Sequence, residues 1–221
     1  MNHLVDSIIT HRGTHIEMFQ RPDGKITCYM DGEIQSCESD EMFYHEALVQ
    51  PAMFCVSNPK RVLIVGGGEG ATLREVLKCN TVEKVEMIDW DKDVIHLFQT
   101  KYPQWAKGAW TDPRVTIRTE DIMEVIKESQ HRVYDVIIVD LFDPTEDTIN
   151  QLKEILIVLS NWVVQDGAMA VYAGMDPSLI PAHEWFKKNL QMYKKMTHYQ
   201  IPIPSFDGNS LFLLFHTDTT E

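Results

Sequence analysis

Short apolar runs alternate with amphipathic stretches along most of the chain. Beyond Pro59 these runs read RVLIVGG, VEKVEMID, RVTIRT, YDVIIVD and GAMAVYA. Apolar runs of this length, separated by amphipathic segments, are typical of parallel strands that are covered by helices on both faces. The pattern therefore predicts an α/β fold with a Rossmann-like sheet.

The segments between and after these runs predict the remaining elements. Helices are expected over EGATLREVLK, over Asp91–Tyr102, in a short segment from Asp121, over Asp147–Val164 and around Pro181–Leu190. The tail from Thr197 to His216 ends in SLFLLFH and predicts two further strands. The sheet should therefore have seven strands.

The N-terminal part of the chain has a different pattern. Two turn signals, Asp23-Gly24 and Asp31-Gly32, separate short strand-like stretches within residues 14–37. They predict a small β-hairpin appendage over residues 1–38, followed by the Rossmann-like domain over residues 39–221. A helix is expected from Ser39 to Cys55, with a bend or restart at Pro51.

The net charge of the chain limits the classes of molecule that it is expected to bind. The chain has 33 acidic and 20 basic side chains and a formal net charge of −13, which argues against nucleic acid and anionic lipid as partners. A cationic small substrate would be attracted, although an acidic surface also serves solubility alone.

The cysteines and the hydropathy of the chain indicate its location. Cys28, Cys37, Cys55 and Cys79 form neither a CxxC pair nor a regular framework, so neither a zinc site nor a disulfide scaffold is expected. No stretch approaches the ~20 apolar residues of a membrane helix. We expect a soluble protein of the reducing cytoplasm, without a metal and without a membrane partner.

A glycine-rich loop closes the first strand of the sheet. Residues Gly66 to Ala71 fit GxGxxA in a strand–turn–helix setting, where glycines let the backbone approach a ligand. The second strand ends at Asp89, whose carboxylate can accept hydrogen bonds from both hydroxyls of a ribose. Two other interpretations remain: the loop is only a tight turn, and Asp89 caps the following helix.

The third strand supplies another acid. Glu120-Asp121 closes it, and Asp121 is well situated to accept a hydrogen bond from an adenine amino group. Acids after strands two and three favour a nucleoside site of the S-adenosylmethionine type over a dinucleotide site. Asp121 as a simple helix cap is the alternative.

Two acids follow the fourth strand. Asp140 ends YDVIIVD and Asp143 lies three residues later, at the sheet edge where open α/β folds bind ligands. A pair of carboxylates suits an amine nucleophile, which must be held and must lose a proton before it attacks carbon. A capped turn at Asp143-Pro144 is the alternative.

Five motifs resemble, in order and spacing, the spermidine synthase (polyamine aminopropyltransferase) family. They are DGEIQSCESDEMFYHE, NPKRVLIVGGGEGATLREVLK, VEKVEMIDWDKDVI, DPRVTIRTEDI and YDVIIVDLFDP. The resemblance covers about residues 14–215. It implies a methyltransferase-type sheet and the transfer of an aminopropyl group from decarboxylated S-adenosylmethionine to a diamine such as putrescine.

The resemblance also implies roles for individual residues. Asp140 would accept the amine proton, Asp143 would hold the diamine, and Tyr44 and His45 of FYHE would line the amine pocket. Glu69, where the family usually has Asp, would hold the aminopropyl amine. Tyr44 and His45 could instead be ordinary surface or core residues of a helix.

Nucleoside binding would fall to the glycine loop and to the acids after strands two and three. By the resemblance these residues are Gly66, Gly68, Asp89, Asp121 and Ile122. Decarboxylated S-adenosylmethionine is then a co-substrate, and no bound cofactor is required. Family members tend to form dimers or tetramers, so we expect a homodimer or homotetramer.

The chain departs from the family pattern at several positions. Leu141 and Phe142 replace small polar residues, and Ile122 replaces a glycine. Thr14 lies where a ribose-contacting Gln is usual, and IPIP lacks the tyrosine of IPTYP. Two alternatives therefore stay open: a methyltransferase that uses S-adenosylmethionine, and a nucleoside-binding relative without catalysis.

Overall fold

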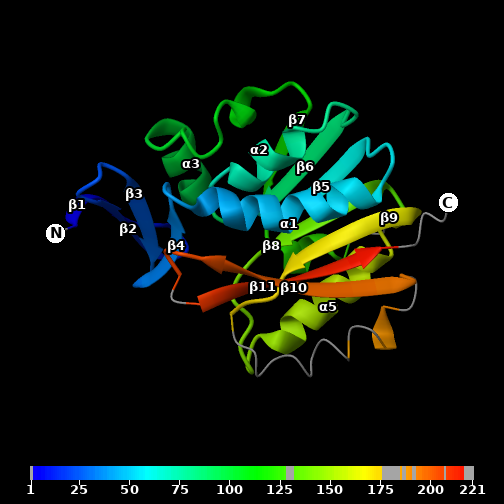
Figure 1. Cartoon of the computed structure of the whole chain (residues 1–221). Coiled ribbons are helices and arrows are strands. Elements are labelled where there is room, and N and C mark those ends of the chain that lie inside the picture. The colour runs from blue at the N-terminus through cyan, green and yellow to red at the C-terminus, as the bar shows by residue number, and fades with distance from the viewer. Residues whose placement is uncertain are drawn as a thin grey trace.

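A seven-stranded sheet forms the centre of the protein (Figure 1), in the order β10-β11-β9-β8-β5-β6-β7. The computed structural model describes residues 2–127, 132–175, 185, 188–190, 193–206 and 208–216. Strands β5 to β9 run parallel, whereas β11 pairs antiparallel with β9 and β10 with β11. The strands are β5 (Arg61–Gly66), β6 (Lys84–Asp89), β7 (Val115–Thr119), β8 (Tyr134–Asp140), β9 (Val163–Tyr172), β10 (Lys195–Ile203) and β11 (Gly208–His216). The predicted α/β fold and its seven strands are confirmed.

Helices cover both faces of this sheet. Helices α1 (Glu41–Cys55) and α2 (Ala71–Leu77) lie on one face, and α4 (Ile122–Val125) and α5 (Ile149–Ser160) lie on the other. Neighbouring residues of β5 alternate between the two cores: Ile64 packs in the cluster with Leu48 and Leu73, and Leu63 in the cluster with Leu156. Burial on both faces explains why the strand sequences are continuously apolar.

A four-stranded antiparallel sheet precedes the central one, in the order β1-β2-β3-β4. Its strands are β1 (His3–Ile9), β2 (His15–Gln20), β3 (Ile26–Met30) and β4 (Glu33–Cys37). Helix α3 (Lys92–Thr100) packs on it, because Phe98 shares a core with Ile16 and Met18. The predicted hairpin is therefore larger than expected. Strand β1 was missed because most of its side chains are exposed, so its sequence carries no buried face.

A bend or a restart was expected at Pro51. The restart is wrong, since α1 runs without interruption from Glu41 to Cys55, and the bend stays a prediction. A proline cannot donate to the carbonyl four residues earlier, which here belongs to Ala47. The hydroxyl of Tyr199 donates to that carbonyl oxygen instead, at 2.6 Å. A strand distant in sequence thus satisfies the acceptor that Pro51 leaves free.

Other element boundaries shift by a few residues. Strand β9 begins at Val163 rather than within GAMAVYA, because Val163 pairs with Tyr134. The helix expected around Pro181–Leu190 falls largely outside the described residues. All four cysteines are free. Across the part of the chain that the structure describes, none of the helices has the length and apolarity to cross a membrane.

Candidate active site

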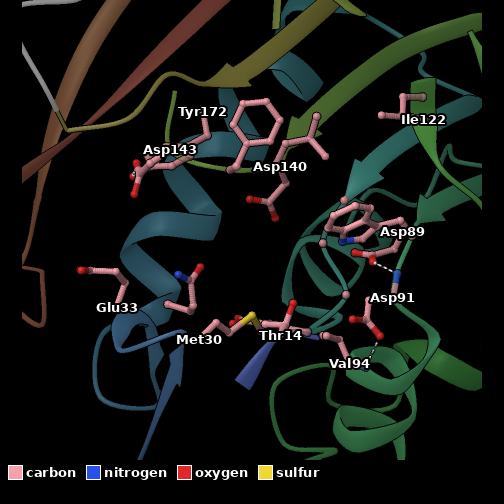
Figure 2. Close-up of a pocket in the computed structure, with 18 of the residues that line it drawn as sticks. Thr14, Met30, Glu33, Asp89, Asp91, Val94, Ile122, Asp140, Asp143 and Tyr172 are labelled. Atoms are coloured by element: carbon pink, nitrogen blue, oxygen red, sulfur yellow. Dashed lines mark hydrogen bonds between the residues drawn. The ribbon is translucent and has the colours of Figure 1, made fainter. Parts of the chain in front are cut away.

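A cavity of about 510 Å3 opens at the carboxyl ends of the parallel strands. The residues singled out from the sequence all line it: Thr14, Tyr44, His45, Gly66, Gly68, Glu69, Asp89, Asp121, Ile122, Asp140 and Asp143. Figure 2 shows Asp89 and Ile122 on one side, Asp143 and Glu33 on the other, and Asp140 between them. The structure therefore brings together all the predicted site residues in one cavity.

The glycine loop lies directly against two of the acids. Gly66 has φ +87°, and a Cβ there would come within 1.8 Å of the Asp140 carbonyl oxygen. A Cβ on Gly68 would lie 2.8 Å from Asp89 Oδ2. Side chains at these positions would displace the acids, so both glycines are required by the shape of the cavity.

Asp89 faces the cavity at the end of β6. Helix α3 is capped by Asp91, whose carboxylate accepts from the amides of Asp93 and Val94, so the capping alternative does not apply to Asp89. Burial, together with the nearby charges of Asp91 and Asp140, outweighs the hydrogen bonds from the amides of Asp91 and Gly68 and raises the pKa of Asp89 to about 6. The two amides use only part of the accepting capacity of this carboxylate, which keeps lone pairs for ligand hydroxyls.

Asp121 does cap a helix, as the alternative interpretation held. Its Oδ1 accepts from the amide of Met123 at 2.8 Å and begins α4. The cap occupies one oxygen, and Asp121 and the buried Ile122 still line the cavity. Trp90, which the sequence interpretation overlooked, lines it beside Asp89 and has the Arg12 guanidinium 5.1 Å from its ring centroid. Its position directly after Asp89 was the available signal.

Two hydroxyl groups hold the carboxylate of Asp140. Tyr44 donates to Oδ1 at 2.7 Å, and Thr72 donates to Oδ2. Burial and the negative charge of Asp140 raise the pKa of Tyr44 well above its ordinary value, so this hydroxyl keeps its proton and acts as the donor. Thr72 was not predicted, because nothing in its local sequence indicates that it faces the end of β8.

Asp143 is exposed at the rim of the cavity and accepts a hydrogen bond from Tyr172. Burial and the charge of Asp143 raise the pKa of Tyr172 above its ordinary range. The ring of Tyr44 contacts those of Tyr172 and Phe206, with centroids 5.1 Å and 6.1 Å away. These aromatic rings wall the side of the cavity next to Asp143. Tyr172 ends β9, so its position at a strand end could have identified it as a site residue from the sequence. Nothing in the sequence around Phe206 indicates that it lines the cavity.

Glu69 and His45 lie together on the cavity wall beside Asp140. Burial raises the pKa of Glu69 to about 8, against the opposing effect of His45. Burial disfavours charge on His45, but its hydrogen bond to Glu41 and the negative charges of Asp140 and Glu69 outweigh this and raise the pKa of His45. The cavity therefore favours bound cations, which would stabilise the ionised form of Glu69.

A buried ionic network of Glu41, Arg74 and Glu75 holds the His45 ring through its Nδ1. Glu41 accepts from Nδ1 of His45 at 2.9 Å and from both terminal nitrogens of Arg74, at 2.9 and 3.0 Å. Arg74 also donates to Glu75 and to the Trp105 carbonyl. Burial opposes ionisation of Glu41, but the hydrogen bonds from His45 and Arg74 lower its pKa to about 2. With Nδ1 of His45 engaged, Nε2 is the nitrogen available to the cavity.

Comparisons with known proteins give a consistent result. A family model described as the spermine/spermidine synthase domain matches residues 41–220. "Polyamine aminopropyltransferase 1" of Hyperthermus butylicus is 44% identical over 189 residues, which cover 81% of this chain and 64% of the relative. "Polyamine aminopropyltransferase" of Aeropyrum pernix is 36% identical, over 89% of this chain and 63% of the relative. This chain thus spans less than two thirds of the length of these relatives.

Solved structures agree with the sequence comparisons. Spermidine synthase from Thermotoga maritima superposes with a TM-score of 0.82 at 28% identity, covering 99% of this chain and 74% of that one. A spermidine synthase in complex with the transition state analogue AdoDATO gives a TM-score of 0.84 at 28% identity, covering 99% of this chain and 75% of that one.

Proposed function

The chain belongs to the spermine/spermidine synthase family, and from this premise we propose that it is a polyamine aminopropyltransferase. It would transfer the aminopropyl group of decarboxylated S-adenosylmethionine to a diamine such as putrescine and release methylthioadenosine. One observation supports this most strongly: Asp140 lies between the nucleoside side of the cavity and a second acid, Asp143, on the amine side.

The proposed reaction is a direct displacement. The amine nitrogen attacks the propyl carbon next to the sulfonium, the carbon–sulfur bond breaks, and its electron pair stays on sulfur as methylthioadenosine leaves. Asp140 accepts the proton that the amine loses, and Asp143 holds the distal ammonium. Because the sulfonium is already activated, most of the acceleration comes from orientation, which can contribute ~7–11 kcal/mol.

The altered loop after Asp140 is compatible with this reaction. Leu141 and Phe142 line the cavity and pack against the apolar cluster that contains Val139. Both side chains are partly buried and pack against the core, which steadies the loop between Asp140 and Asp143. A relative without catalysis is the weaker hypothesis for this reason.

A methyltransferase is the second candidate, and Glu69 discriminates between the two. An acid on the cavity wall repels the carboxylate of S-adenosylmethionine and attracts the ammonium of its decarboxylated form. Incubation with either nucleoside and a panel of amines, followed by mass spectrometry of the products, tests the proposal. Amines enlarged by an aminopropyl group support it, and methylated amines contradict it.

Several further expectations stay predictions. They are a location in the cytoplasm, assembly into homodimers or homotetramers, and a reaction without a metal or bound cofactor.

Affinity for decarboxylated S-adenosylmethionine is expected to rise with pH up to about 8, by at most about tenfold per pH unit. Below that pH Glu69 is protonated, and binding an ammonium requires its proton to leave. Calorimetry at several pH values measures this. Glu69→Gln should flatten the curve above about pH 7 and narrow the preference for the decarboxylated form over S-adenosylmethionine. Methylthioadenosine lacks the aminopropyl group and its ammonium, so it should bind equally well throughout that range. Tighter binding of the carboxylated nucleoside to the wild type would contradict the prediction.

Asp89→Ala is expected to weaken methylthioadenosine binding by about 1–3 kcal/mol, because ribose hydroxyls lose their acceptor. In the wild type this affinity should also fall as the pH drops below about 6, where Asp89 becomes protonated. Glu124→Ala, which removes an exposed acid outside the cavity, is the matched control. Equal affinities of wild type and Asp89→Ala would remove Asp89 from the site.

A further inference from the structure

We propose that Thr72 is a positioning residue that fixes the orientation of the Asp140 carboxylate for proton transfer. Thr72 does not line the cavity, and it acts only through Asp140. This inference rests on the proposed function, since it assigns Asp140 the role of proton acceptor.

The contact comes from a fully buried side chain. Thr72 is the second residue of α2 and has 0% of its surface exposed. Its hydroxyl donates to Oδ2 of Asp140. A Cβ on Gly67 would lie 3.4 Å from the Thr72 Cβ, so the side chain is packed directly under the glycine loop. The surrounding atoms leave this hydroxyl little freedom to turn elsewhere.

Three donors together determine the position of Asp140. Tyr44 donates to Oδ1 at 2.7 Å, Thr72 donates to Oδ2, and the amide of Gly67 donates to the backbone carbonyl at 3.2 Å. One hydroxyl on each oxygen fixes the plane of the carboxylate, and each oxygen keeps a lone pair for a ligand. With the Thr72 hydroxyl removed, only the Tyr44 hydrogen bond restrains the plane of the carboxylate, which can then rotate through a larger angle about its Cβ–Cγ bond.

Such a rotation would alter catalysis more than binding. An amine poised for attack on carbon must be aligned with the carbon–sulfur bond, and a misplacement of about 1 Å can cost about 10²-fold in rate. The residues proposed to bind the nucleoside, Asp89 and Asp121, line the cavity, whereas Thr72 does not. The effect should therefore fall on kcat.

Two substitutions separate the contribution of the Thr72 hydroxyl from that of its methyl group. Thr72→Val keeps the shape and removes the donor, and kcat should fall by about 10–100-fold. KM for the amine and methylthioadenosine affinity should stay within about twofold of the wild type, because the net charge at Asp140 is unchanged. Thr72→Ser keeps the donor and should retain kcat within about threefold.

Thermal stability provides the control for a merely structural role. Thr72→Ser leaves a methyl-sized cavity and should melt below the wild type, whereas Thr72→Val should melt near it, because Asp140 can turn toward water in the open cavity. Activity and melting temperature are thus expected to rank the variants differently. A Val variant with wild-type kcat, or a Ser variant as impaired as the Val variant, would overturn the proposal.

A crystal structure of Thr72→Val distinguishes failure of this inference from failure of the proposed function. The Asp140 carboxylate should be rotated or present in two orientations relative to the wild type. This readout needs no turnover, so it holds even if the wild type transfers no aminopropyl group. A carboxylate that keeps its wild-type orientation would overturn the positioning role.

Discussion

Replacement of Asp140 by asparagine is expected to lower turnover by about 10²–10⁴-fold, the usual contribution of a positioned acid or base. The amide has nearly the same shape as the carboxylate, and it can still accept from Tyr44 through its oxygen. It lacks the negative charge that holds an ammonium and cannot take the amine proton. Steady-state kinetics at saturating amine measure the loss.

Nucleoside affinity separates a catalytic defect from a damaged cavity. Methylthioadenosine should bind Asp140→Asn nearly as well as the wild type, since the residues proposed to bind its ribose and base are Asp89 and Asp121. Asp166→Asn changes an exposed acid outside the cavity and should leave turnover unchanged. An Asp140→Asn variant with unimpaired turnover would mean that another group takes the proton.

Arg74→Met is expected to lower the free energy of unfolding by about 3–5 kcal/mol, because it leaves the buried carboxylates of Glu41 and Glu75 without their guanidinium. Arg74 is 8% exposed and also donates to the carbonyl of Trp105, so its removal disrupts three contacts at once. Urea denaturation measures the change. Lys60→Met breaks the exposed pair with Glu83 and should lower the free energy of unfolding far less than Arg74→Met does.

The Arg74 effect should depend on pH in a defined direction. The pKa of Glu41 is lowered to about 2 in the folded protein, below its ordinary value in the unfolded chain. This carboxylate therefore stabilises the fold at pH values above its ordinary pKa, and the contribution is lost as the pH falls toward 2. The gap between wild type and Arg74→Met should narrow in acid. A gap that is constant from neutral pH down to about pH 3 would contradict the role given to Glu41.

The central sheet could be predicted because the burial of each strand leaves a signal in that strand's own sequence. Each strand of the parallel core is buried on both faces, so runs such as RVLIVG are unmistakable in the sequence. Strand β1 and the continuity of α1 could not be predicted in this way. The first depends on backbone pairing with β2, and the second on a hydroxyl from Tyr199, which lies 152 residues away from its acceptor.

The residues of the candidate site also differ in whether the sequence could predict them. Asp89, Asp121 and Asp140 could be located because strand ends converge at one edge of a parallel sheet. The residues that support them lie on neighbouring elements, and their side chains turn toward the site only in the folded chain. Thr72 and Arg74 look like ordinary helix residues, and only the packing of α2 against α1 and β8 gives them partners. Tertiary contacts of this kind carry no periodic signal.

The most direct test of aminopropyl transfer is a competition between the two nucleosides. The protein is incubated with putrescine and equal concentrations of S-adenosylmethionine and its decarboxylated form, and the products are quantified by mass spectrometry. The acids on the cavity wall predict aminopropylated amine and methylthioadenosine in equal amounts, with no methylated amine. Methylated amine together with S-adenosylhomocysteine as the main products would contradict the proposed function.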